Sequence, residues 1–147
     1  MNAKPAVRYW HLWSDADGVS HQTCCAMTEF DLKSMKPPAD PQWQGKRLSG
    51  QMTTLVTVLP VGWIGTWHEN PTPQWIVPLS GRWFVESMDG TRVEMGAGEL
   101  SFGGDQNCRD VDRKLGHRSG TVGDAPAVLM VIQFEGVPAP SSPCEFQ

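Results

Sequence analysis

Short apolar or alternating runs, separated by turn-forming residues, occupy most of the chain, and each run has the length of a β-strand. The predicted strands span residues 7–13, 20–30, 51–59, 63–68, 74–79, 82–88, 92–95, 99–102, 117–122 and 127–134. The 15 glycines and 12 prolines are dispersed between these runs, where they favour turns. Many short strands with such turns are typical of an all-β barrel or sandwich.

The segment 31–50 is the least regular part of the chain, and its prolines and charges predict a loop or a short helix that wraps the surface. The preceding hairpin is too small to be stable alone, so it belongs to the same domain. We therefore expect one domain with three parts: residues 1–50 as hairpin and wrapping loop, 51–135 as the barrel, and 136–147 as a flexible tail.

Composition and charge limit the possible binding partners and the expected cellular location of the protein. The formal net charge of −4 disfavours binding to nucleic acid, and no apolar run reaches the roughly 18–20 residues that span a membrane. The N-terminal residues lack a charged-then-apolar leader pattern, so we expect a cytoplasmic protein. The cysteines form no CxxC pair, and we expect idle thiols rather than a metal site or a disulfide. They are Cys24, Cys25, Cys108 and Cys144.

Three polar side chains are predicted to converge near the turn at residues 70–73. His68 and Asn70 are two positions apart on a strand and so share one face, while the proline-containing turn brings Gln74 back on the next strand. On that returning strand both faces are mainly apolar, as in a strand covered on both sides. Pro78 lacks a ladder donor, which predicts a sheet edge or a bulge at that position.

The spacing of these residues resembles a known motif. Five residues separate Gly62 from His68, one residue separates His68 from Asn70, three separate Asn70 from Gln74, and six separate Gln74 from Gly81. This pattern resembles the first motif of the cupin family, which has a second His at position 70 and a Glu at position 74. The spacing matches, whereas two of the three ligand identities differ.

A second stretch resembles the other cupin motif. Gly90 is followed after five residues by Gly96-Ala97-Gly98, with Gly96 where the family usually has Pro. His117-Arg118, followed by residues 123–127, is similar to the end of that motif, where a third His stands; Thr121 takes the place of the usual Asn. The resemblance covers about residues 51–134 and implies a small, single-domain, bacterial-type cupin with a degenerate metal-ligand motif, folded as a double-stranded β-helix (jelly roll).

In cupins, three His and one Glu bind a divalent metal inside the barrel. Carried over by position, the ligands are His68, Asn70, Gln74 and His117, for Zn, Fe, Mn or Ni. Neutral amides compensate none of the ion's charge and are poor ligands for these ions. A site without a metal is therefore the alternative. Asp105 would supply the missing charge if its loop, residues 103–116, folded over the barrel mouth.

The resemblance implies an enzyme of isomerase, lyase or dioxygenase type that binds a small organic molecule. His68, His117 and Asp105 are the candidate catalytic residues, and Asn70 and Gln74 are candidate substrate-binding residues. A non-catalytic small-molecule-binding module is the alternative, and a structural role for each histidine stays open. Cupin barrels often pair, so we expect a homodimer.

The remaining aromatic and histidine residues carry no motif. His11 and His21 are expected on the surface or in a subunit interface. We assign the seven Trp to core filling and an interface rather than to a stacking platform, because Trp63 and Trp67 should face away from His68.

Overall fold

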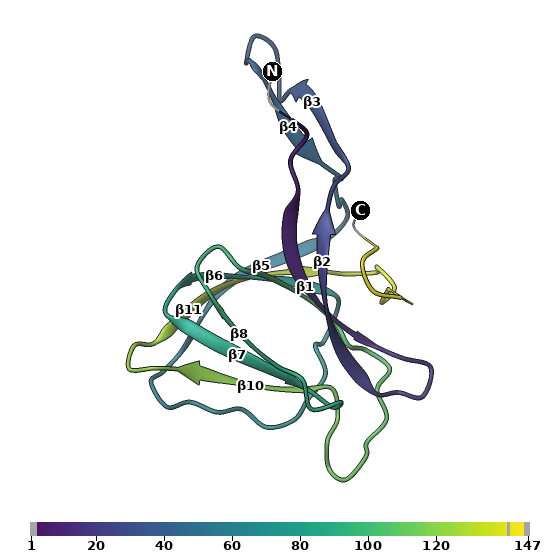
Figure 1. Ribbon diagram of the computed structural model, residues 1–147, viewed down its shortest axis with the longest axis vertical. Coiled ribbons are helices and arrows are strands. Elements are labelled where there is room, and N and C mark those ends of the chain that lie inside the picture. Colours follow the sequence, from purple (N-terminus) through teal and green to yellow (C-terminus); the bar gives the residue numbers. More distant parts are fainter. Residues whose placement is uncertain (1–2, 141, 146–147) are drawn as a thin grey trace.

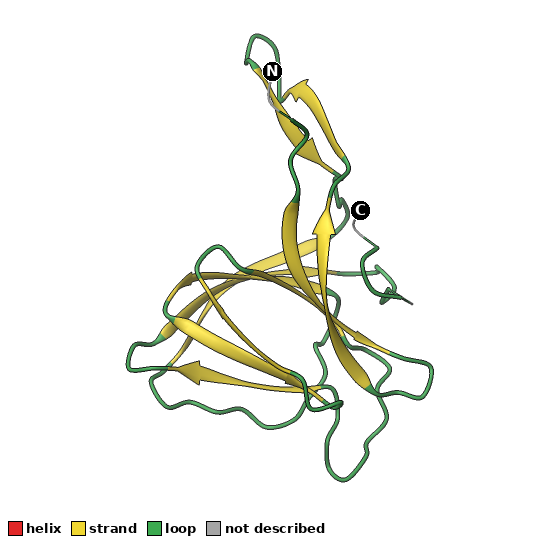
Figure 2. Ribbon diagram, viewed as in Figure 1, coloured by secondary structure: helices red, strands yellow, loops and turns green. Residues whose placement is uncertain are grey.

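Two β-sheets and a separate hairpin make up the regular structure of the computed structural model, which describes residues 3–140 and 142–145. Within the described residues there is no helix long and apolar enough to cross a membrane. Figure 2 shows strands joined by turns and loops. The strands are β1 (Val7–Ser14), β2 (Ser20–Met27), β3 (Phe30–Ser34), β4 (Pro41–Gly45), β5 (Met52–Leu59), β6 (Gln74–Ser80), β7 (Arg82–Ser87), β8 (Arg92–Gly96), β9 (Leu100–Gly104), β10 (His117–Val122) and β11 (Ala127–Phe134).

The larger sheet has the order β2-β1-β9-β6-β11-β5, and the smaller sheet has the order β10-β7-β8 (Figure 1). The segment before β6 lies along β10 through two isolated bridges, Ile64 to Gly120 and His68 to His117. From β5 onward the chain therefore passes repeatedly from one sheet to the other. This winding is a double-stranded β-helix, or jelly roll, and it agrees with the predicted fold class.

The predicted strand at residues 63–68 is wrong as a regular strand. Four steps of chain separate Ile64 from His68, but only three separate their partners His117 and Gly120. One residue is thus left unmatched, which interrupts the ladder as in a β-bulge. The extra residue also reverses the alternation of side chains, with a consequence for Trp63 described below.

The larger sheet is apolar on both faces because both are covered. Along β11, Leu129 and Val131 point between the two sheets, whereas Ile132 and Phe134 belong to a second cluster on the outer face. The alternation of period two explains this division. The second cluster also contains Leu48 and Cys144, so residues around these two positions cover the outer face.

The predicted irregularity at Pro78 is confirmed as a bulge. Leu129 pairs with Pro78 while the neighbouring Val128 pairs with Ser80, which leaves one residue of β6 unmatched. β6 lies inside the sheet between β9 and β11. A bulge at this point accommodates a residue that cannot donate a backbone hydrogen bond.

The prediction of a loop or helix for residues 31–50 is wrong. β3 and β4 form a two-stranded hairpin that projects away from the barrel, as Figure 1 shows. The prolines are compatible with it because Pro41 begins β4, while Pro37 and Pro38, joined by a cis peptide bond, lie in the connecting turn. Leu32 and Trp43 pair with each other across this hairpin, and each has polar neighbours on its own strand, as in the alternating pattern of a β-strand.

Two expectations about the N-terminal hairpin and the tail are also corrected. Cys25 and Cys144 form a disulfide rather than standing as idle thiols, and it ties the tail, predicted to be flexible, to β2. Cys24 and Cys108 are free. His11, expected on the surface or in a subunit interface, is fully buried within the chain and accepts a hydrogen bond from the backbone N–H of Cys144. Burial lowers the pKa of His11 to about 4, against a smaller opposite effect of Glu145.

His21 connects the β1–β2 turn to the β7–β8 turn. Its Nε2 lies 2.7 Å from a carboxylate oxygen of Asp15, and its Nδ1 lies 2.9 Å from one of Asp89. The other oxygen of Asp15 accepts the backbone N–H groups of Asp17 and Val19, as in a plain turn. Next to His21, Ser20 accepts from the backbone of Met88 and donates to Gly116. The N-terminal hairpin is thereby fixed to the start of β10.

We predict a pH-dependent stabilisation by His21. Burial by itself lowers its pKa, but the hydrogen bonds and charges of Asp15 and Asp89 outweigh this effect and raise it above 6.5. The native chain should therefore exceed His21→Gln in free energy of unfolding at pH about 6, and the difference should shrink as the pH rises toward about 9. Chemical denaturation at several pH values measures it. When Asp15→Asn and Asp89→Asn are also present, the effect of His21→Gln on the free energy of unfolding should no longer depend on pH. A difference between the native chain and His21→Gln that grows with rising pH contradicts the prediction.

Candidate functional site

His68 and His117 lie side by side at one end of the barrel. Each backbone N–H donates to the carbonyl of the other over 2.9 Å, so the two residues form a hydrogen-bonded antiparallel pair. Their side chains therefore share a face, and the ring centroids are 4.6 Å apart. Gly116 permits this approach, because at its φ of +74° an added Cβ would collide with the carbonyl of His68.

A fully buried carboxylate, Asp105, follows the end of β9 and faces this pair. Its Oδ2 accepts a hydrogen bond of 2.7 Å from His117 Nδ1. Its Oδ1 accepts from the backbone N–H of Asn70 at 3.0 Å and from Asn70 Nδ2 at 2.7 Å. Burial by itself raises the pKa of Asp105, but the bonds from His117 and Asn70 outweigh it and lower the pKa below its ordinary value. Asp105 is therefore ionised at neutral pH.

A chain of side-chain amides extends from this carboxylate. Since Asp105 only accepts, Asn70 must present its Nδ2 to it, and Asn70 Oδ1 then accepts from Gln74 Nε2 at 2.5 Å. Gln74 Oε1 in turn accepts from Gln133 Nε2 at 3.0 Å. Gly103 leaves room for this arrangement, because an added Cβ there would collide with the Asn70 amide. One buried charge thus orients three amides.

The same contacts fix the protons on both imidazoles. His117 Nδ1 must carry hydrogen to donate to the ionised Asp105, and His68 Nδ1 must carry hydrogen to donate to the carbonyl of Thr66 at 2.8 Å. In the neutral form of each ring, the lone pair is therefore on Nε2. Both rings line the cavity inside the barrel, so each Nε2 is the nitrogen available to accept a proton or to bind a ligand.

The cavity has a volume of about 170 Å³, and His68, which is exposed, is part of its lining. Its imidazoles and amides lie at the His68–His117 end, and aliphatic, indole and hydroxyl side chains form much of the remaining wall. The lining residues are Thr57, Leu59, Trp63, His68, Asn70, Pro71, Gln74, Ile76, Trp83, His117, Ser119, Leu129 and Val131. This volume is below the roughly 300–1,000 Å³ of sites for drug-sized ligands, so the cavity suits a smaller molecule.

The structure brings together all five of the residues singled out from the sequence: His68, Asn70, Gln74, Asp105 and His117. Two features of the site were missed. Trp63, expected to face away from His68, lines the same cavity, because the unmatched residue between the two bridges reverses the alternation. The second feature is Gln133, which lies on the same face of β11 as Leu129 and Val131. A polar residue at the end of this otherwise apolar face could have indicated, from the sequence alone, that the strand reaches the site.

The donor groups do not fit the predicted divalent metal site. Asp105 directs its two oxygens to Asn70 and His117, and the amide oxygens of Asn70 and Gln74 each accept a hydrogen bond from another amide. That leaves two neutral imidazole nitrogens and no anionic ligand, whereas catalytic zinc sites have three protein ligands. Among the described residues no group of three His, Cys, Asp or Glu side chains is arranged to hold a metal ion.

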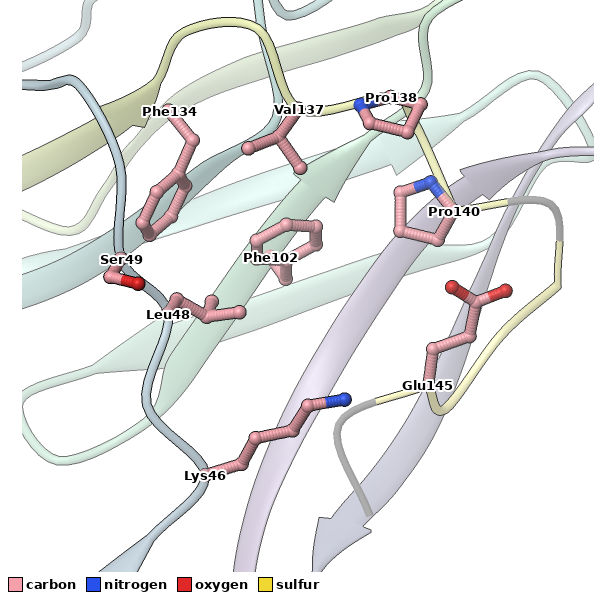
Figure 3. Close-up of a pocket in the computed structure, with 9 residues that line it drawn as sticks. All are labelled: Lys46, Leu48, Ser49, Phe102, Phe134, Val137, Pro138, Pro140 and Glu145. Carbon is pink, nitrogen blue, oxygen red and sulfur yellow. The ribbon is translucent and has the colours of Figure 1, made fainter.

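A larger hollow, of about 230 Å³, lies on the outer face of the larger sheet (Figure 3). Phe102 and Phe134 line it from the sheet, Leu48 covers one side, and Val137 and the two prolines of the tail close another. It contains none of the candidate residues. We take the barrel cavity as the site because the buried carboxylate and both histidines meet there.

No protein-family model matches the sequence, and neither does any curated protein. Among solved structures, protein NMB1881 from Neisseria meningitidis is similar with 17% identity and a TM-score of 0.43, covering 63% of this chain and 84% of that one. A cupin-2 domain containing protein from Shewanella frigidimarina is similar with 12% identity and a TM-score of 0.43, covering 70% and 83%. The strand order itself, with the chain winding between two sheets, gives this protein a double-stranded β-helix, or jelly-roll, fold.

Proposed function

We propose that the chain is an enzyme that transfers a proton on a small organic molecule in the barrel cavity, as an isomerase or lyase does. The observation that supports this proposal is the buried hydrogen bond of 2.7 Å between His117 and the Asp105 carboxylate, beside a cavity with apolar walls. A carboxylate behind an imidazole that faces a pocket is the arrangement by which enzymes hold a general base. A dioxygenase reaction lacks support, because the donor set does not fit the metal.

In the proposed mechanism, Nε2 of neutral His117 takes a proton from the substrate. The resulting imidazolium is stabilised by Asp105, whose charge is already oriented by Asn70 and needs no rearrangement. His68, with its ring 4.6 Å away, acts as the acid in its protonated form and gives its Nε2–H to a neighbouring substrate atom. The proton that His117 has taken and the proton that His68 has lost are then exchanged with solvent, which restores both rings. Imidazole exchanges protons readily near pH 7, so one ring serves as base and the other as acid.

Asn70 and Gln74 have two roles in this proposal. Both line the cavity, where they contact the ligand, and both belong to the amide chain that holds Asp105 in place. Asp105 is a positioning residue rather than a catalytic one, because its two oxygens are bonded to Asn70 and His117 and it does not line the cavity.

Hydrogen–deuterium exchange next to a carbonyl tests the proposal. The native protein should accelerate C–H to C–D exchange in one or more small cyclic ketones in D₂O, measured by proton NMR. His117→Ala should lower the rate by about a hundredfold or more, and Asp105→Asn should lower it in the same direction. His21→Gln, a control outside the cavity, should leave it unchanged. Equal rates in native protein and His117→Ala would refute the proposed base.

The alternative, a binding module without turnover, has one observation in its favour. The amide chain from Gln133 to Asp105 uses most of the polar groups at the His68–His117 end of the site for internal hydrogen bonds. In the same experiment, a ketone that binds in the cavity but exchanges no faster than in buffer would favour this alternative.

Elemental analysis tests the metal interpretation. Protein produced in medium that contains Zn, Fe, Mn and Ni should hold well under one divalent ion per chain, because two neutral imidazoles are too few ligands. His68→Ala should leave the metal content unchanged. One ion per chain that is lost on His68→Ala would contradict this prediction and favour the metal-binding set His68, Asn70, Gln74 and His117.

The homodimer expected from the sequence remains a proposal, and we place its interface on β5. This strand is one of the two edges of the larger sheet, has no charge or proline, and exposes Leu55, Val56 and Val58 to 42%, 56% and 54%. Unprotected edges of this kind are rare in monomers, and antiparallel pairing of β5 with a second copy satisfies both edges by one two-fold axis.

Light scattering should give the mass of a dimer for the native chain and of a monomer for Val56→Lys. Val111→Lys, at a loop residue that is 50% exposed, should stay dimeric. A native monomer at micromolar concentration contradicts the proposal.

Cytoplasmic location and the absence of nucleic-acid and membrane partners remain predictions. The Cys25–Cys144 disulfide counts against the cytoplasm, because such bonds persist mainly in oxidising compartments.

A further inference from the structure

A disulfide holds the tail against the outer face of the larger sheet. Cys25, on β2, and Cys144, in the tail, are 119 residues apart in sequence and are joined covalently. A second bond forms at the same tail residue, because the backbone N–H of Cys144 donates to Nδ1 of His11, on β1, over 3.1 Å. The tail is thereby fixed to both strands of the N-terminal hairpin at one point.

The described part of the tail has little else that would keep it in place. Residues 136–140 and 142–145 belong to no strand or helix. Pro138, Pro140 and Pro143 have no backbone N–H, so they cannot donate backbone hydrogen bonds to the barrel. Chain segments of this kind are commonly poorly ordered unless a bond or a docked element ties them down. The covalent bond at Cys144 is therefore the main restraint on the position of the tail.

The tail covers apolar surface of the barrel. Its residues Val137, Pro138 and Pro140 form one wall of the hollow that Phe102 and Phe134 line from the sheet (Figure 3). These two phenylalanines are only 1% and 4% exposed and belong to the outer aromatic cluster. Removal of the tail would expose this side of the cluster to solvent.

The tail also keeps His11 away from solvent. The imidazole contacts the edge of Phe102, with ring centroids 5.4 Å apart, and bonds to the backbone of Cys144. Burial lowers the pKa of His11 to about 4, and Glu145 of the tail acts weakly in the opposite direction. If the tail moved away, this pKa would return toward its ordinary value of about 6.5. The ionisation of His11 thus reports whether the tail is in place.

We propose that the Cys25–Cys144 disulfide is a redox switch whose reduction releases the tail and exposes the aromatic outer face of the larger sheet. A dithiol supplies the two electrons and two protons. Its thiolate bonds to one sulfur of the disulfide, the S–S bond breaks, and the departing sulfur takes a proton. The second thiol of the reductant then breaks the mixed disulfide, so that the reductant becomes a disulfide and both cysteines become thiols. The state of the outer face then follows the redox state of the compartment.

Reduction with dithiothreitol tests the switch. The native chain should show two free thiols before treatment, Cys24 and Cys108, and all four afterwards, counted with a thiol reagent on the denatured protein once the reductant is removed. The fluorescence of anilinonaphthalene sulfonate, a dye that binds exposed apolar surface, should rise several-fold on reduction of the folded chain. In an NMR titration, the imidazole of His11 should ionise near pH about 6.5 only in the reduced chain.

Two variants serve as matched controls. The double variant Cys25→Ser, Cys144→Ser should bind the dye and titrate at His11 like the reduced chain, with or without dithiothreitol. Cys24→Ser removes the exposed free thiol beside the disulfide and should respond to reduction like the native chain.

The proposal is overturned if the chain with four thiols keeps low dye fluorescence and a His11 pKa of about 4, because the tail then stays in place without the bond. It is also overturned if reduction disperses the native methyl signals of Leu129 and Val131, which lie between the sheets, because the disulfide then stabilises the whole fold. A disulfide that dithiothreitol leaves intact in the folded chain is no switch either. None of these measurements requires turnover, so their outcome is independent of the exchange experiment with His117→Ala.

Discussion

The burial of one carboxylate governs the site. Asp105 has no contact with solvent, and an unpaired charge in such a place is costly, so its oxygens must be fully bonded. Asn70 and His117 provide those bonds. The direction of each donor then follows: the amides of Asn70 and Gln74 have one possible orientation, and the imidazole of His117 has one tautomer. The chemistry of the cavity is therefore set by a residue that does not line it.

The jelly roll makes this burial possible because it joins chain segments that are remote in sequence. Asp105 follows β9, His117 begins β10, and His68 precedes β6, yet the three meet where the chain crosses between the sheets. The same crossing leaves an apolar cavity beneath them. The carboxylate at the top of this cavity is already engaged by the imidazole of His117 and the amide of Asn70.

The N-terminal hairpin and the tail support the barrel from outside. β1 extends the larger sheet beside β9, and the disulfide between β2 and Cys144 holds the tail over the outer aromatic cluster. Ser20 bonds Gly116, the residue before β10, and His21 joins the β1–β2 turn to the β7–β8 turn. The segment that carries His117 is thus held from two sides, by the barrel and by the hairpin.

The sequence by itself determined the strands with regular alternation, an irregularity at Pro78, and the convergence of His68, Asn70 and Gln74, because these depend on local period and backbone chemistry. Only the tertiary structure decided the disulfide, across 119 residues, and the inward face of Trp63. It also decided that the carboxylate of Asp105 accepts its hydrogen bonds from His117 and Asn70. These contacts depend on proximity in space, and local sequence patterns do not encode which distant residues the fold brings together.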